Sequence, residues 1–133
     1  MPSVASEPLN ELLALRQIIK TLSKPNTAVA VYHLLETWGV IGLVLYWSIV
    51  LSPVATGVTG VIVYFVAVAV VASRQHALMV LTHEGIHKRL SRIVWLNDGL
   101  ARYVAACPVF ISLAKWRFIH LYHHQYTQTA DDP

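Results

Sequence analysis

The sequence predicts an all-α membrane protein built around a two-span transmembrane hairpin. Of its 133 residues, 56% are hydrophobic and only 13% are charged, whereas a soluble domain carries roughly 25% charged residues. No Asp, Glu, Lys or Arg occurs from Thr37 to Ser73. That run is too long for one span of about 20 residues and covers most of two. We therefore expect four parts: an N-terminal amphipathic helix, the hairpin, a cytoplasmic helical extension and an interfacial helix.

Residues 1–27 form the first predicted unit, an amphipathic cytoplasmic segment. Its leucines and isoleucines recur at helical spacing, and Lys24-Pro25 is expected to end the helix because the residue before a proline disfavours the α conformation. This helix can lie on the membrane surface or pack on the rest of the protein, and the sequence favours neither.

Residues 28–133 form the second predicted unit. Its spans are expected at about 28–51 and 54–73, joined by a turn at Pro53. His33 and Glu36 lie in the first third of the first span, close to its cytoplasmic end, where a structural role is expected for both.

The distribution of charge predicts the orientation. Basic residues lie before the first span and after the second, and the connector around Pro53 has none. By the positive-inside rule, both termini face the cytoplasm of a multi-pass integral membrane protein, in a bacterial inner membrane or the endoplasmic reticulum. The basic residues flank spans, so we expect no nucleic-acid partner. Cys107 is the only cysteine, which excludes an intrachain disulfide and a thiolate metal cluster.

The second helix is expected to continue beyond the membrane, since Ser73 to His83 contains no helix breaker. At about 100° per residue, His76, His83 and His87 then fall within about 40° of one another. Residues 93–114 are apolar but interrupted by Asn97, Asp98, Arg102 and Pro108. We expect an interfacial or re-entrant segment there, because a third span would carry the later histidines to the opposite side of the membrane.

Two histidine clusters follow the hairpin. Cluster one is His83 and His87, and cluster two is His120, His123 and His124. Histidines at i and i+4 share one face of a helix and can bind one metal ion together. Imidazole sites without thiolates suit zinc, copper, iron or nickel. The paired clusters predict a metal centre at the membrane surface.

The first cluster also reads His-Glu-x-x-His, the zinc metalloprotease motif, in which Glu84 would be the general base. A membrane zinc protease needs three protein ligands and an open position, which leaves most of cluster two unexplained. A non-catalytic, metal-binding membrane protein is the other alternative.

The two clusters and the words around them resemble the membrane fatty acid desaturase family. The similarity rests on Leu81–His87, Asn97-Asp98, Arg117–His124 and Asp131–Pro133. It implies a non-haem di-iron centre that uses O₂ to desaturate, or otherwise oxidise, a lipid acyl chain, with electrons from a ferredoxin- or cytochrome b5-like donor.

Carried over to this chain, the resemblance makes His83, His87, His120, His123 and His124 metal ligands. His76, Glu84, Asp131 and Asp132 are possible additional ligands or partners of ligands. The family has a third histidine cluster after two further spans, which this sequence does not contain. We therefore expect the N-terminal part of an enzyme, inactive on its own.

Overall fold

The computed structural model describes residues 7–51, 54 and 56–133. Its described residues form helices and no strand. They are α1 (Glu7–Leu22), α2 (Thr27–Leu51), α3 (Gly57–Ile86), α4 (Val94–Gly99), the π-helix η1 (Leu100–Ala106), the short 3₁₀-helix η2 (Cys107–Val109) and α5 (Leu113–Tyr126). The expected all-helical membrane fold is confirmed. The predicted turn at Pro53 lies outside the described residues.

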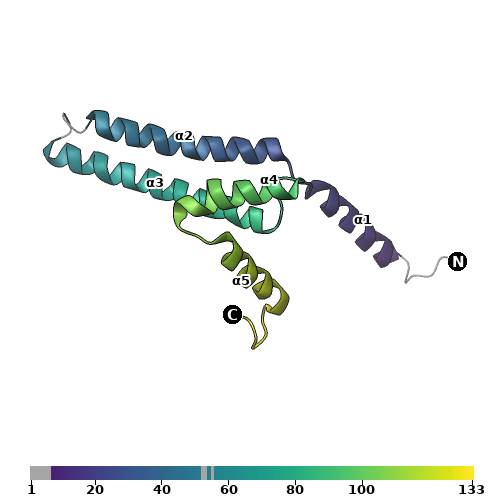
Figure 1. Cartoon of the computed structure of the whole chain (residues 1–133). Coiled ribbons are helices and arrows are strands. Elements are labelled where there is room, and N and C mark those ends of the chain that lie inside the picture. The colour runs from purple at the N-terminus through teal and green to yellow at the C-terminus, as the bar shows by residue number, and fades with distance from the viewer. Residues whose placement is uncertain (1–6, 52–53, 55) are drawn as a thin grey trace.

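Helices α2 and α3 form a long antiparallel hairpin (Figure 1). Both are long and apolar enough to cross a membrane. Their outer surface is exposed; Val58, for example, is 77% exposed and Phe65 is 63% exposed. Such a surface is stable in a membrane, because lipid chains cover the apolar side chains and the helix itself satisfies the backbone polar groups. The second helix starts at Gly57, three residues later than predicted, and continues to Ile86 as expected.

One ion pair joins the two spans. Arg74 on α3 donates to the carboxylate of Glu36 on α2 at 2.8 Å. An ionised group inside a membrane is costly unless it is paired or reaches the interface. The pair satisfies both charges and supports the structural role expected for Glu36.

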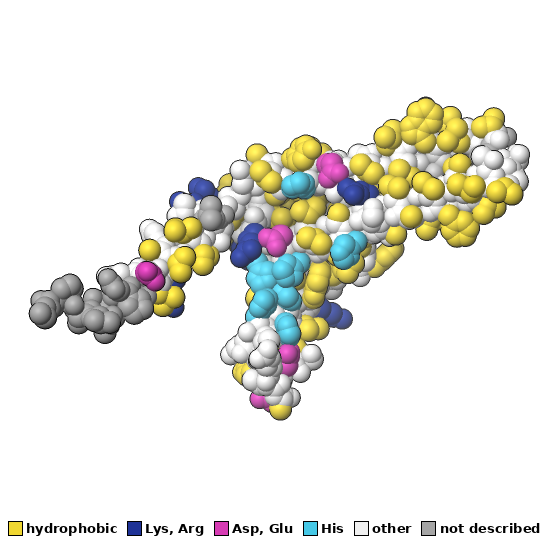
Figure 2. All heavy atoms as spheres, turned by 180° about the vertical axis from the view of Figure 1, so that it is seen from behind, with side chains coloured by type: hydrophobic (Ala, Val, Ile, Leu, Met, Phe, Trp, Pro, Cys, Tyr) yellow, Lys and Arg dark blue, Asp and Glu magenta, His cyan; other side chains and the backbone are white. Residues whose placement is uncertain are grey.

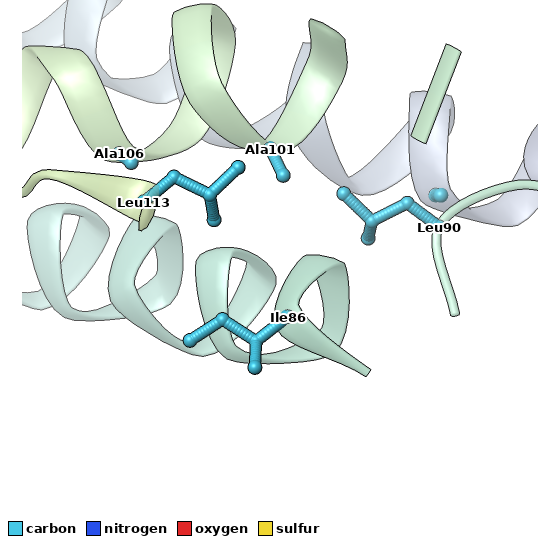
Figure 3. Close-up of a cluster of buried hydrophobic side chains, with 6 residues drawn as sticks. Ile86, Leu90, Ala101, Ala106 and Leu113 are labelled. Atoms are coloured by element: carbon cyan, nitrogen blue, oxygen red, sulfur yellow. The ribbon is translucent and has the colours of Figure 1, made fainter. Parts of the chain in front are cut away.

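The core lies where the end of α3, the start of α2 and the segment 94–113 meet. Figure 3 shows Leu90, Leu113 and Ala101 pointing toward one another, and Ile86 and Ala106 belong to the same buried cluster. A second cluster joins Leu34, Ile41 and Leu78 to Ala105. These contacts place η1 against both helices of the hairpin, and the indole nitrogen of Trp38 also donates to the carbonyl of Val104 at 3.1 Å.

Gly85 allows η1 to approach α3 closely. A Cβ atom at this position would lie 2.3 Å from the Cβ of Ala101. Real carbon atoms do not approach so near, and a packed interior gives way only at a cost of about 1–3 kcal/mol. The small residues at 85 and 101 therefore set the distance between the two elements.

A bend of 100° separates the segment Val94–Val109 from α5. Phe110 has φ 59°, in the left-handed region, and the side chain of Ser112 accepts a hydrogen bond from the backbone of Lys115 at the start of α5. The bend turns α5 away from the hairpin, next to the end of α3 (Figure 1). The segment 94–109 thus doubles back along α3; its depth in the membrane stays a prediction.

Helix α1 projects from the hairpin in Figure 1. Every side chain described between Asn10 and Thr21 is exposed, including Leu12, Ile18 and Ile19. The predicted helix is present, and its apolar side chains have no protein surface over them among the described residues. The two placements that the sequence allows for this helix both stay predictions.

Candidate metal centre

Cluster one sits at the end of α3. His83 is in the last helical turn and His87 is the residue that closes the helix, with its backbone N–H bonded to the carbonyl of His83. Their ring centroids are 4.7 Å apart. The i,i+4 spacing brings both imidazoles to one side, as the sequence predicts.

Cluster two sits on α5, where His120 and His124 are also one turn apart. Their ring centroids are 4.5 Å apart and their Nε2 atoms are separated by 2.9 Å. α5 presents these two rings to the end of α3.

The two pairs converge. The Nε2 atoms of His87 and His120 lie 2.9 Å apart although the residues are 33 positions apart in the chain. One ring nitrogen from each of His83, His87, His120 and His124 can be chosen so that all four lie within 4.8 Å of one another. We call these residues the four-histidine group. Figure 2 shows histidine side chains gathered where the C-terminal arm leaves the body of the protein.

The distances fit a metal ion. A nitrogen ligand lies about 2.1 Å from a bound transition metal, so opposite nitrogens are about 4.2 Å apart and adjacent ones about 3 Å apart. The ring nitrogens of the group, all within 4.8 Å of one another, are close to this spacing. Four imidazoles and no thiolate favour iron, zinc, copper or nickel.

The electrostatics keep these rings in the form that binds metals. Burial, followed by the neighbouring rings of His83 and His124, lowers the pKa of both His87 and His120. A protonated imidazole has no lone pair for a metal ion, whereas a neutral one does. At neutral pH the rings of His87 and His120 are therefore ready to ligate.

Glu84 lies beside this group. Its carboxylate oxygen Oε1 is 3.4 Å from Nδ1 of His83, and its other oxygen is 3.8 Å from the guanidinium of Arg89. A carboxylate next to one ring nitrogen fixes the tautomer and leaves Nε2 for a metal. The position suits the supporting role expected for Glu84.

Four other predicted site residues, His123, His76, Asp131 and Asp132, lie outside the group. The ring of His123 faces Asp132, with Nδ1 and Oδ1 2.7 Å apart, and its centroid is 6.3 Å from that of His120. His76 is exposed on α3, about 10 Å along the helix axis from His83. Asp131 is exposed near the end of the chain. The ligand role of His123 and the assisting roles of His76, Asp131 and Asp132 stay predictions.

A polar bracket ties the two clusters together. The carbonyl of Gly85, between the two histidines of cluster one, accepts hydrogen bonds from Asn97 at 2.9 Å and from Arg117 at 3.1 Å. Arg117 lies one turn before His120 on α5. The Asp98 carboxylate accepts from Arg117 at 2.7 Å and from Lys88 at 2.6 Å. We call Gly85, Lys88, Asn97, Asp98 and Arg117 the bracket.

The bracket is electrostatically strong. Partial burial alone would raise the pKa of the Asp98 carboxyl, but hydrogen bonds from Arg117, Lys88 and Asn97 outweigh it and hold the pKa far below its usual range. Lys88 reaches Asp98 from a left-handed backbone, at φ 60°. Sequence reasoning noted Asn97-Asp98 and Arg117 only as parts of a motif.

Sequence comparisons match this region of the chain to known proteins. A family model described as fatty acid desaturase matches residues 59–133, which include both clusters and the bracket. An sn-1 oleoyl-lipid 12-desaturase from Picosynechococcus sp. is 34% identical over 53 residues, covering 40% of this chain and 15% of the relative. One from Anabaena variabilis is 28% identical over 130 residues, covering 92% of this chain and 34% of the relative.

The chain thus spans about a third or less of the length of these relatives. No solved structure matches it.

Proposed function

Because this chain belongs to the fatty acid desaturase family, we propose that it supplies the first two histidine clusters of the iron centre of a membrane lipid desaturase. The observation that carries the proposal is the convergence of four imidazoles from α3 and α5. Family membership favours this interpretation of His83-Glu84-x-x-His87 over a zinc protease, in which cluster two would have no role.

The four-histidine group fits iron. Neutral imidazoles bind Fe²⁺ without cancelling its charge. Glu84 lies against the ring of His83, and Arg117 of the bracket holds the backbone carbonyl of Gly85 between His83 and His87. A di-iron centre held by these residues would activate O₂, with two electrons from a donor, so that two hydrogens can be removed from an unactivated alkyl chain. The resemblance assigns the second iron further histidines, from a third cluster, and leaves His123 available as a ligand.

The substrate class we propose is an acyl chain of a membrane lipid, which is also what the names of the two relatives describe. The hairpin sets the four-histidine group at the membrane surface, where such a chain can arrive sideways. The apolar groove of about 520 Å³ between α2 and α3 is lined by Leu45, Tyr64 and Ala72, among others. It contains no histidine or carboxylate, so we place the reaction at the histidines and not in this groove.

Electrons have to come from outside the chain. A ferredoxin- or cytochrome b5-like protein is the proposed donor, on the cytoplasmic side. Both termini lie on that side in this proposal, where the exposed side chains of Arg102 and Lys115 can face the donor.

A domain exchange tests the proposal. This chain replaces the aligned third of the Anabaena variabilis relative, and the chimera is expressed in a host without lipid desaturases. Gas chromatography of the cellular fatty acids is expected to show a new unsaturated acid. The same chimera carrying His83→Ala or His120→Ala is expected to make none.

A matched control is His33→Gln, which removes a histidine of α2 that lies outside the four-histidine group. It is expected to leave the new fatty acid in place. Equal product from the His83→Ala, His120→Ala and unchanged chimeras would rule the proposal out. The 133-residue chain alone is expected to yield no desaturated lipid.

A further inference from the structure

Two recesses flank the turn between α1 and α2. The first, of about 310 Å³, lies between this turn, α3 and the residues that follow α3, and includes Arg89 in its lining. The second, of about 650 Å³, lies between the same turn and residues 91–93. Both share Lys24, Pro25 and Asn26 as a common wall. They open beside the cytoplasmic end of the hairpin and lie outside the four-histidine group.

The walls are preformed. The side chain of Asn26 accepts hydrogen bonds from the backbone of Ala28 at 3.1 Å and of Val29 at 3.3 Å, which fixes the turn. Thr27 donates to the buried hydroxyl of Ser91 at 3.0 Å, and this bond joins the two sides of the larger recess. A ligand therefore meets a shaped surface and does not have to order a loop.

The recesses are basic. Lys24, Arg89 and Arg92 line them, and Glu84 is the only acidic residue in their lining. Glu84 is already engaged with His83 and Arg89. Within the described part of the chain, no carboxylate lies within ion-pair distance of Lys24 or Arg92. Two unneutralised cations facing one hollow favour an anionic ligand.

The recesses lie at the depth of lipid headgroups. Helix α2 has 25 residues, or about 37 Å at 1.5 Å per residue, and exceeds a hydrocarbon core of about 30 Å by roughly 7 Å. Its Leu51 end is uncharged and its Thr27 end follows Lys24 and Asn26. The excess length therefore belongs at the Thr27 end, within the headgroup layer.

An apolar edge adjoins the basic wall. Directly after Arg92, Ile93 is 50% exposed, Val94 62% and Trp95 74%. Tryptophan prefers the boundary between headgroups and lipid chains. A cationic hollow with an exposed apolar rim suits a molecule that has an anionic head and an acyl tail.

We propose that these recesses bind the phosphate-bearing headgroup of an anionic phospholipid, with Lys24 and Arg92 pairing with the phosphate and the Ile93–Trp95 edge facing the glycerol and chains. The site includes none of the four-histidine group, although the first recess shares Glu84 with the surroundings of that group, and it does not depend on the proposed desaturase activity. It anchors the junction of α1, α2 and α4 in the cytoplasmic leaflet.

Native mass spectrometry of the purified chain, in micelles holding equal amounts of phosphatidylglycerol and phosphatidylcholine, tests the site. The unchanged chain is expected to retain phosphatidylglycerol preferentially. Two basic contacts correspond to roughly thirty-fold in affinity, so K24Q/R92Q is expected to lose the preference. Each single variant, K24Q or R92Q, is expected to bind phosphatidylglycerol roughly fivefold more weakly. The single variants replace the double variant in the test if the double variant lacks the helical circular dichroism of the unchanged chain.

The matched control is R16Q/K20Q, which removes the same charge from α1 without touching the recesses. It is expected to keep the preference within about threefold, because charge at that distance is screened. If both double variants lost the preference for phosphatidylglycerol equally, the effect would be diffuse electrostatic attraction and the proposal would be overturned. An unchanged chain that showed no preference would also overturn it. Displacement of the lipid by soluble glycerol phosphate at the same phosphate concentration would also overturn it, since the recess would then bind free phosphate.

Discussion

Glu36 and Arg74, which bound the uncharged run of the sequence at its two ends, form an ion pair with each other at 2.8 Å. The pair lies at the border of the uncharged part of the hairpin, which comprises residues 37–73. On the face drawn in Figure 2, the half of the hairpin beyond the pair carries only apolar and neutral side chains. The two charged residues that border the uncharged run thus lie at the same level of the two antiparallel spans.

The first prediction concerns this pair. Glu36→Gln or Arg74→Gln leaves one charge without its partner, and each is expected to destabilise the hairpin by about 1 kcal/mol, between the values for exposed and buried pairs. The double variant is expected to lose less than the sum of the two. Denaturant titration in detergent, followed by circular dichroism, measures this. Strictly additive losses would show that the two side chains do not interact.

The second prediction concerns Gly85. Gly85→Ala places a methyl group against Ala101 and is expected to cost about 1–3 kcal/mol, the range for overpacking. Ala101→Gly in the same chain is expected to restore part of the loss, since it removes the opposing methyl group. The thermal midpoint in detergent is the measurement.

Gly39→Ala is the matched control, because a Cβ there meets nothing within 4 Å. It is expected to leave stability unchanged or to raise it by up to about 1 kcal/mol. If Gly85→Ala left the thermal midpoint unchanged, as Gly39→Ala is expected to do, η1 would not lie as close to α3 as the structure shows.

The third prediction concerns the bracket. Asp98→Asn removes the carboxylate that holds Arg117 and Lys88, so α5 loses its fixed position relative to α3. The affinity for Co²⁺, used as a visible substitute for iron, is expected to fall by about 10–100-fold, as is typical when a partner of a metal site is lost. Absorption titration in the visible range reports both the affinity and the ligand geometry. Asp131→Asn, at an exposed carboxylate, is expected to bind Co²⁺ as the unchanged chain does.

The fourth prediction separates the neighbours His123 and His124. His124 belongs to the four-histidine group and His123 pairs with Asp132. In this chain, His124→Ala is therefore expected to weaken the binding of one Co²⁺ ion by more than tenfold, and His123→Ala by less than threefold. The reverse order would mean that the His123 ring leaves Asp132 when a metal arrives and that His124 is not a ligand of this ion.

The helices and the two clusters were predictable because they depend on local patterns. Each prediction used residues that are near one another in the sequence. These were the uncharged run, the spacing of His83 and His87, and the absence of a helix breaker between Ser73 and Gly85. The shared face of His76, His83 and His87 was also inferred, but only the last two meet cluster two, because α5 approaches α3 at its end. A helical wheel gives direction around the axis and not position along it.

The bend and the bracket were beyond sequence reasoning for a different reason. Phe110 adopts a left-handed backbone that a residue with a Cβ rarely takes, so nothing in its identity predicts the 100° turn. The link from Gly85 to Arg117 joins residues 32 positions apart, and only tertiary contact reveals it. The pairing of His123 with Asp132 likewise depends on how the chain folds after α5.

The 2.9 Å between His87 and His120 imposes a rule of parity on the chain. Two side chains that meet must stand on the same side of the bilayer, so the stretch that connects them crosses it an even number of times. The connecting residues are too few for two crossings of about 20 residues each, and the number is therefore zero. Any additional histidine that joins this group from a later part of a longer chain must likewise arrive after an even number of crossings.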